Sequence, residues 1–217
     1  MRPETRELEV AVGDVRLPGD LTLPPEPGGA VIFAHGSGSS RLSARNRQVA
    51  GTIVEAGVAT LLFDLLTPRE AAERAKVFDI ELLAERLLAA THRLRHEQEV
   101  GVLPLGYFGA STGAAAALWA AAEPDSRARA VVSRGGRPDL AGDRLERVTA
   151  PTLLIVGGAD PTVLELNREA QQGLRCENDL IVIPGAGHLF EEPGALEEVS
   201  HWATAWFVKH LAGGERA

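Results

Sequence analysis

The sequence predicts an α/β fold with three layers: a mostly parallel, twisted sheet of about eight strands with helices on both faces. Short, uninterrupted apolar runs recur along the chain, as expected for strands that are buried on both faces. Between these runs, apolar residues recur at helical spacing. Because strands that alternate with helices favour right-handed crossovers, the strands should be parallel neighbours in one sheet.

An antiparallel hairpin is predicted to open the sheet. Apolar and polar residues alternate from Leu8 to Val12 and again from Val15 to Leu23, which is the period of a half-buried strand. Gly13 lies between the two runs as a turn residue. The apolar runs that predict the remaining strands cover residues 30–34, 58–63, 103–108, 128–132, 151–156 and 180–183.

Helices are predicted where apolar residues recur every three or four positions. Small residues after Thr112 favour a closely packed helix there. The other predicted helices cover residues 80–94, residues 163–174 with Thr162 and Glu165 in capping-box spacing, and residues 196–211 with an end at Gly213 and Gly214.

Length and composition predict one soluble globular domain over residues 1–217, with 45% apolar and 24% charged residues. The formal net charge of −8 disfavours nucleic acid as a partner. The polar start MRPETRELEV has no apolar signal core, and no apolar run approaches the ~20 residues of a membrane span. We therefore expect a cytoplasmic protein without a membrane partner, and the sequence leaves homo-oligomer formation open.

The motif GASTG, residues 109–113, follows one predicted strand and precedes the small-residue helix. A serine in such a strand-turn-helix junction stands clear of the sheet, because the flanking glycines lack side chains that would collide. Ser111 is therefore the candidate nucleophile. The Thr112 amide, at the helix N-terminus, is a candidate donor to a developing negative charge.

A serine nucleophile needs a base, and the base needs an acid that fixes its orientation. Asp160 follows the strand predicted at 151–156, and His188 follows the strand predicted at 180–183. Both lie at carboxyl ends of strands, in the chain order Ser, Asp, His. A helix-start aspartate before Pro161 and a solvated loop histidine are the alternatives, but these do not explain both positions together. We predict Ser111, Asp160 and His188 as the catalytic residues.

The loop after residues 30–34 should supply the second oxyanion donor. We choose the Ser37 amide, with Gly36 as the neighbouring alternative, and take His35 and Gly36 as candidate substrate-binding residues. Arg134 and Arg137 follow another predicted strand and could hold a substrate carboxylate. A structural pairing of these arginines with Asp139 or Asp143 is the alternative.

Four motifs resemble the α/β-hydrolase superfamily: AHGSG at 34–38, GASTG at 109–113, GGAD at 157–160 and GAGH at 185–188. Within it, the chain resembles the dienelactone-hydrolase-like serine hydrolases without a lid domain, over nearly its whole length. The resemblance implies an α/β-hydrolase fold with no cap domain, and ester hydrolysis through an acyl-enzyme with no cofactor. True dienelactone hydrolases use a cysteine where this chain has Ser111, so a general carboxylesterase is preferred to a lactone hydrolase.

The expected function is cleavage of small or short-acyl esters, because residues 134–149 are too few to form a lid over the site. A thioesterase, lactone hydrolase or amide hydrolase would use the same residues, and a non-catalytic ligand-binding module would share the fold. No metal is expected, since His92 and His96 lack an evident third ligand. The segment at 67–75 could shape the acyl pocket or form a mobile rim.

Overall fold

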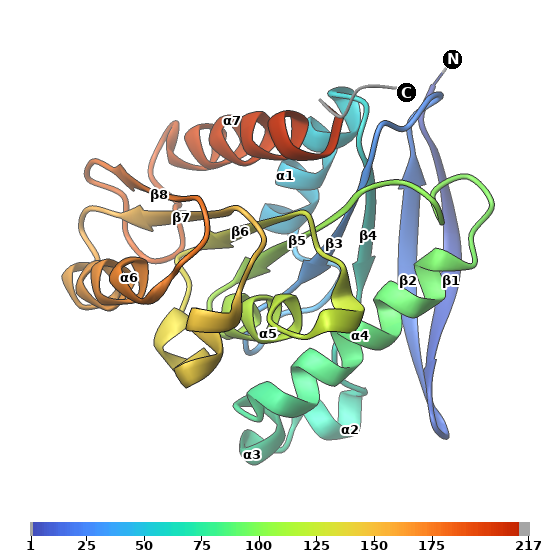
Figure 1. Ribbon diagram of the computed structural model, residues 1–217, viewed down its shortest axis with the longest axis horizontal. Coiled ribbons are helices and arrows are strands. Elements are labelled where there is room, and N and C mark those ends of the chain that lie inside the picture. Colours follow the sequence, from blue (N-terminus) through green and yellow to red (C-terminus); the bar gives the residue numbers. More distant parts are fainter. Residues whose placement is uncertain (1, 213–217) are drawn as a thin grey trace.

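The computed structural model describes residues 2–212 and contains an eight-stranded sheet in the order β1-β2-β4-β3-β5-β6-β7-β8 (Figure 1). β1 pairs antiparallel with β2, β2 pairs antiparallel with β4, and the other pairs are parallel. The predicted sheet and its opening hairpin are therefore confirmed. The strands are β1 (Glu4–Val12), β2 (Val15–Leu23), β3 (Ala30–Ala34), β4 (Ala59–Phe63), β5 (Leu105–Ala110), β6 (Ala130–Arg134), β7 (Thr152–Gly157) and β8 (Asn178–Ile183).

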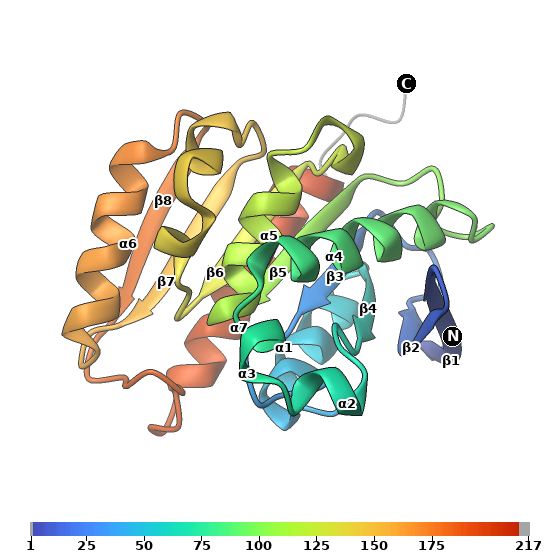
Figure 2. The ribbon, with the colours of Figure 1, turned by 90° about the horizontal axis from the view of Figure 1, so that it is seen from below.

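Helices cover both faces of the sheet (Figures 1 and 2). On one face lie α1 (Ala44–Glu55) and α7 (Ala195–Phe207), which continues into a π-helical turn at Val208–Ala212. On the other face lie α4 (Ile80–Arg95), α5 (Thr112–Ala121) and α6 (Pro161–Gly173). Two short helices, α2 (Pro68–Ala71) and α3 (Arg74–Val77), and 3-10 turns at Pro124–Ser126 and Pro138–Arg147 complete the described chain. No separate cap domain occurs within residues 2–212.

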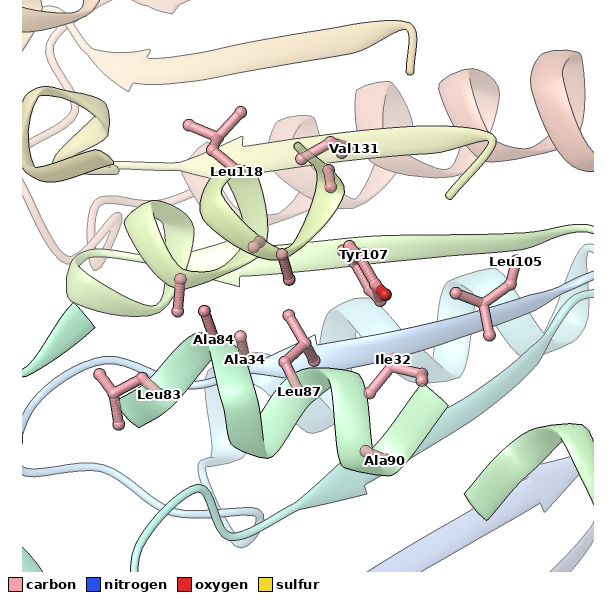
Figure 3. Close-up of a cluster of buried hydrophobic side chains, with 14 of the residues drawn as sticks. Ile32, Ala34, Leu83, Ala84, Leu87, Ala90, Leu105, Tyr107, Leu118 and Val131 are labelled. Carbon is pink, nitrogen blue, oxygen red and sulfur yellow. The ribbon is translucent and has the colours of Figure 1, made fainter. Parts of the chain in front are cut away.

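The larger core lies between the sheet and helices α4 and α5 (Figure 3). Leu87 and Leu118 come from the two helices, and Ile32 and Val131 come from strands that they cover. Removing such side chains from water is the main favourable term in folding. Tyr107 is fully buried among them, and its hydroxyl is 2.7 Å from Thr91 Oγ1, so its polar atom is satisfied.

Several sequence predictions need correction or completion. The capping box at Thr162 and Glu165 is wrong, because the N-cap of α6 is Asp160, whose carboxylate accepts the Val163 N–H, with Pro161 in the first turn. Helix α1 is absent from the predicted elements. The predicted helix end at Gly213 and Gly214 lies outside the described residues. Strands β5, β6 and β7 end one or two residues later than the apolar runs that predicted them, so β6 ends at Arg134.

The segment at 67–75 is folded as α2, the turn after it and the start of α3. Thr67 and Glu70 form a reciprocal capping box at the start of α2. Glu70 also accepts a hydrogen bond of 3.2 Å from Arg86 of α4. This buried ion pair attaches the segment to the helix layer.

In the part of the chain described here, no helix is both long and apolar enough to cross a membrane.

Helix α5 starts in close contact with the strands beneath it. A Cβ added at Gly109 would lie within 3.0 Å of the Ala114 backbone, and one added at Gly113 would lie equally close to the carbonyl oxygens of Ala34 and His35. Real Cβ atoms essentially never approach other atoms so closely. The two glycines therefore set how near α5 comes to β5 and to the end of β3.

Gly113→Ala should destabilise the protein by about 2–4 kcal/mol, because backbone must move to admit the new methyl group. Gly51→Ala is the matched control, since Gly51 lies in helix α1 with nothing within 4 Å of an added Cβ. We expect that variant to gain roughly 0.5–1 kcal/mol. Urea unfolding of both variants measures the difference, and an unchanged midpoint for Gly113→Ala would contradict this account of the turn.

Candidate active site

Ser111 occupies the sharp turn between β5 and α5. Its backbone has φ 52° and ψ −120°, one of three non-glycine residues in the described chain with positive φ. Such a conformation costs on the order of 1–3 kcal/mol and persists only where the surroundings impose it. Ser111 N–H donates to the Arg134 carbonyl over 3.2 Å, and the Ser111 carbonyl accepts from Ala114 N–H and Arg137 N–H, each over 3.1 Å. These contacts hold the serine at the carboxyl edge of the sheet.

Asp160 and His188 are in direct contact. His188 Nδ1 lies 2.8 Å from Asp160 Oδ2, although the residues are 28 positions apart. The other carboxylate oxygen of Asp160 accepts the Val163 N–H over 3.4 Å. Since Asp160 caps α6 and contacts the histidine at once, the helix start fixes the carboxylate that orients the imidazole. The helix-start role considered in the sequence analysis is thus present together with the contact to His188.

The loop that carries His188 is anchored at several points. Ala159 N–H donates to the Ala186 carbonyl over 2.9 Å, which joins the loops after β7 and β8. Gly187 N–H donates to Glu192 Oε1 over 3.0 Å. Phe190 has φ 55° and is 2% exposed, so its ring fixes the loop in the core beneath α7. Sequence reasoning missed Glu192 and Phe190, although an aromatic two residues after a candidate base was a usable signal.

Ser111 and His188 occupy neighbouring positions at this edge. A Cβ added at Gly135 would lie 3.2 Å from the His188 carbonyl oxygen and 3.7 Å from its Nδ1. Gly135 directly follows Arg134, the residue that binds Ser111 through its carbonyl. Among residues 2–212, no hydrogen bond joins Ser111 Oγ to the imidazole. Such contacts are often long in ligand-free enzymes and shorten in the substrate complex.

The two proposed oxyanion donors are linked to one another. Ser37 N–H donates to Thr112 Oγ1 over 3.0 Å, so the Ser37 amide is occupied in this arrangement. The Thr112 and Gly36 amides have no hydrogen-bond acceptor within the described residues. A Cβ added at Gly36 would lie 3.0 Å from Ser111 Cβ, which shows how closely this loop passes Ser111. The Gly36 alternative therefore has the freer donor, and the Ser37 amide requires Thr112 Oγ1 to give way.

His35 supports this loop through both ring nitrogens, and its role in substrate binding stays a prediction. Its Nδ1 lies 3.0 Å from the Gly36 carbonyl oxygen, and its Nε2 accepts the Leu65 N–H over 3.0 Å. A carbonyl can only accept, so Nδ1 carries the proton and the ring is neutral. Burial lowers the pKa of His35, because the charged ring would lose its hydration. Asp64 also holds the loop after β3, because its Oδ1 accepts a hydrogen bond of 2.7 Å from Arg41 N–H.

The two candidate arginines behave differently. Arg137 forms a two-pronged pair with Asp139, with Nε–Oδ1 and Nη2–Oδ2 distances of 2.8 and 2.7 Å. The structural pairing considered in the sequence analysis therefore holds for Arg137. Arg134 is 8% exposed and has no carboxylate partner within the described chain.

A cavity of about 130 Å³ opens beside the proposed oxyanion donors. Ser37 and Thr112 line one side of it. The apolar part of its lining comes from the loop after β4, from α2 and α3, and from α4. These apolar residues are Leu65, Leu66, Pro68, Ala71, Val77 and Leu83. The undecided segment at 67–75 therefore forms part of a pocket wall.

Cys176 lies away from this edge, before β8, and is half-buried. Its Sγ is 3.7 Å from Thr152 Oγ1. Burial raises the pKa of the thiol, which favours the unreactive protonated form. Among the described residues, no group of three His, Cys, Asp or Glu is arranged to hold a metal ion.

The fold and this edge define the class of protein. Residues 3–199 match the model of the alpha/beta hydrolase family, and the chain belongs to that family. The crystal structure of a dienelactone hydrolase from Anabaena variabilis is 52% identical and superposes with a TM-score of 0.93, covering 97% of this chain and 100% of that one. The chain is therefore a dienelactone-hydrolase-like protein, and its family and fold are those of a hydrolase.

Two further relatives extend the comparison. A Mycobacterium tuberculosis protein whose name suggests a phosphoribosyl transferase is 61% identical over 207 residues, which are 95% of this chain. The chain spans only 47% of that relative. Est1E from Butyrivibrio proteoclasticus is 18% identical, with a TM-score of 0.80 over 94% of this chain and 98% of its own, and shows the fold alone.

His35 should make the stability of the protein depend on pH. Its folded pKa lies below the unfolded value of about 6.5, so the unfolded state binds the proton first. The unfolding free energy should fall as pH drops below about 6.5, by up to ~1.4 kcal/mol per pH unit, until the folded pKa is passed. Urea unfolding at pH 7.5 and 5.5 measures this loss, and His35→Gln should reduce it. His92→Gln, at an exposed helix position, is the matched control.

Proposed function

We propose that this protein is a serine hydrolase of the carboxylesterase type that cleaves small or short-acyl esters through an acyl-serine intermediate. Ser111 is the nucleophile, His188 the general base and Asp160 the acid that orients it. The observation that carries the proposal is the 2.8 Å contact between His188 Nδ1 and Asp160 Oδ2 at the same sheet edge as the strained Ser111 turn. A base oriented by an acid is what a serine hydroxyl requires to react at neutral pH.

The reaction proceeds in two halves. Ser111 Oγ attacks the ester carbonyl while His188 Nε2 takes its proton, since Nδ1 is engaged with Asp160. His188 then gives the proton to the leaving alcohol, and the acyl group stays on Ser111. Water attacks the acyl-serine in the same way, with His188 again as base and then as acid. Asp160 remains ionised and stabilises the imidazolium in each half.

The oxyanion is held by the Thr112 amide and by a second amide from the loop after β3. Thr112 N–H begins α5, so the helix dipole adds to its donation. Gly36 N–H is the freer second donor. Ser37 N–H serves if the oxyanion displaces Thr112 Oγ1, which now accepts from it. Preorganised donors of this kind are worth about 3–4 kcal/mol each in the transition state.

Substrate size follows from the cavity beside these donors. Its volume of about 130 Å³ and its apolar wall suit a short acyl chain. A thioester, lactone or amide would use the same residues, and the ester is proposed as the general case because Ser111 replaces the cysteine of true dienelactone hydrolases. A small-molecule ester is thus the proposed ligand. The cytoplasmic location remains a prediction of the sequence.

The transferase name of the Mycobacterium tuberculosis relative does not lead to a second proposal. That name describes a protein of which this chain matches 47%. In this chain, the Ser111 turn and the contact of His188 with Asp160 fit acyl transfer to a hydroxyl and then to water. We therefore propose hydrolysis for the shared part.

Intact mass after incubation with a fluorophosphonate tests the nucleophile. The wild type should gain one adduct. It should also hydrolyse 4-nitrophenyl acetate and butyrate with a larger kcat/KM than a long-chain 4-nitrophenyl ester. Ser111→Ala should lose the adduct and at least ~10³-fold of the turnover. Folding of the variant is checked by circular dichroism. A folded wild type that takes no label and turns over no ester would favour the non-catalytic binding module instead.

Asp160→Asn separates the two roles of this carboxylate. Asparagine caps a helix about as well as aspartate, so the urea midpoint should stay nearly unchanged. It cannot stabilise the imidazolium or fix its tautomer, so kcat should fall roughly 10³- to 10⁴-fold, as in other triads. Asp179→Asn, on the exposed strand β8, is the matched control. A kcat for Asp160→Asn within threefold of wild type would remove Asp160 from the mechanism.

A further inference from the structure

Arg134 is a buried arginine without a protein partner. It is the last residue of β6, and its side chain is on the face of the sheet that α1 and α7 cover, as is that of Val132 two residues before it. The residue is 8% exposed, and Nη1 is fully buried with no hydrogen-bond partner. No hydrogen bond or ion pair reaches any of its guanidinium nitrogens within the described chain. Arginine is almost never so buried unless it is paired.

The surroundings of Arg134 do not compensate its charge. Burial lowers its pKa to about 10, and the positive charge of Arg45 adds to this effect. The guanidinium remains charged at neutral pH. Its carbon lies 6.0 Å from the centre of the Phe190 ring, at the outer limit of a cation–π contact.

A second group near Arg134 is also positive. Arg45 lies in the first turn of α1, where there is no acidic residue and where the helix dipole adds positive charge. Its Nη1 binds Glu191 over 3.0 Å, but its Nε is buried without a partner. Arg45 therefore adds a second positive charge that acts on Arg134, and Glu191 is its ion-pair partner in the described chain. In a chain of net charge −8, this is a local site of opposite sign.

The position of this site relates it to the nucleophile. The Arg134 carbonyl accepts the Ser111 N–H, and the next residue, Gly135, lies against His188. Phe190, which the guanidinium faces, follows His188 by two residues in the same loop. The Arg134 side chain therefore branches from a stretch of backbone that contacts both the nucleophile and the loop of the base. A guanidinium there can bind two oxygens of one anionic group.

We propose that Arg134, with the added positive charge of Arg45, forms a subsite for a carboxylate or phosphate group of the ester that reacts at Ser111. This inference rests on the proposed function and narrows it to anionic esters. The subsite is separate from the apolar cavity beside Thr112, whose lining does not include either arginine. The anionic group completes the hydrogen bonds that the protein leaves open at Arg134.

Two matched pairs of esters test the subsite by activity. 4-Acetoxybenzoate and its methyl ester differ by a charge in the alcohol half, and mono-4-nitrophenyl glutarate and 4-nitrophenyl butyrate differ by a charge in the acyl half. In Arg134→Met, the ratio of kcat/KM for anionic over neutral ester should fall at least ~10-fold in one pair, as expected for a lost charge-assisted hydrogen bond. In Arg134→Lys, this ratio should fall less. Arg168→Met, at an exposed position in α6, is the control and should keep the wild-type ratio.

Thermal unfolding tests binding without catalysis. Benzoate and inorganic phosphate, added separately, show which kind of anion is bound. At least one should raise the Tm of the wild type, Arg134→Met should lose most of that shift, and Arg134→Lys should lose less of it. Without anions, Arg134→Met should have a higher Tm than the wild type, because an unpaired buried charge has been removed.

The outcomes separate the subsite from the hydrolase. Equal ratios in wild type and Arg134 variants, with no anion-dependent Tm shift, would overturn the subsite and leave fluorophosphonate labelling of Ser111 intact. A lower Tm for Arg134→Met, with unchanged ratios, would also overturn it, in favour of a purely structural contact with Phe190. Conversely, an Arg134-dependent Tm shift in a protein that takes no label would retain the subsite while hydrolysis fails.

Discussion

The close approach of α5 to the sheet is the constraint on which the rest of the site depends. Ser111 holds a backbone conformation that L residues avoid, and the turn exists because Gly109 and Gly113 admit backbone where side chains would collide. The fully buried alanines of α5 continue that contact along the helix. The same approach brings the Thr112 hydroxyl to the Ser37 amide, 75 residues away in sequence. The turn therefore fixes Ser111 and the loop beside it together.

Polar contacts help to fix the loops at this edge. His35 holds the loop after β3 as a neutral hydrogen-bonded ring, and Asp64 holds the same loop through Arg41. Glu192 holds the His188 loop through the Gly187 amide. Asp160 combines helix capping with the contact to His188, so a stable helix fixes the carboxylate that holds the imidazole. Rigid elements thus position groups that themselves lie on loops.

Local patterns in the sequence were sufficient to predict the sheet, the hairpin, the Ser111 turn and the residues that follow β7 and β8. Each depends on residues close together in the chain, such as GASTG after an apolar run. Helix α1 was missed because its sequence, ARNRQVAGTIVE, begins with polar residues, and Asn46 is buried despite its polarity. The occupied Ser37 amide could not be predicted either, since its acceptor comes from a distant helix. Pro161 next to Asp160 was the local signal that helix α6 begins at Asp160 and not at Thr162.

Arg134 has no carboxylate partner in the described chain, which the composition would not predict. Acidic residues outnumber basic ones, 30 to 22, so carboxylates are available to pair with every arginine. Other arginines with little exposure do have one: Arg86 binds Glu70, and Arg41 binds Asp64. At Arg134, the fold instead places a second arginine and an aromatic ring. An arginine whose donors are open in the free protein can give its hydrogen bonds to a bound molecule without first breaking a protein pair. The buried, unpaired charge then destabilises the free protein, and binding of an anionic group removes that destabilisation.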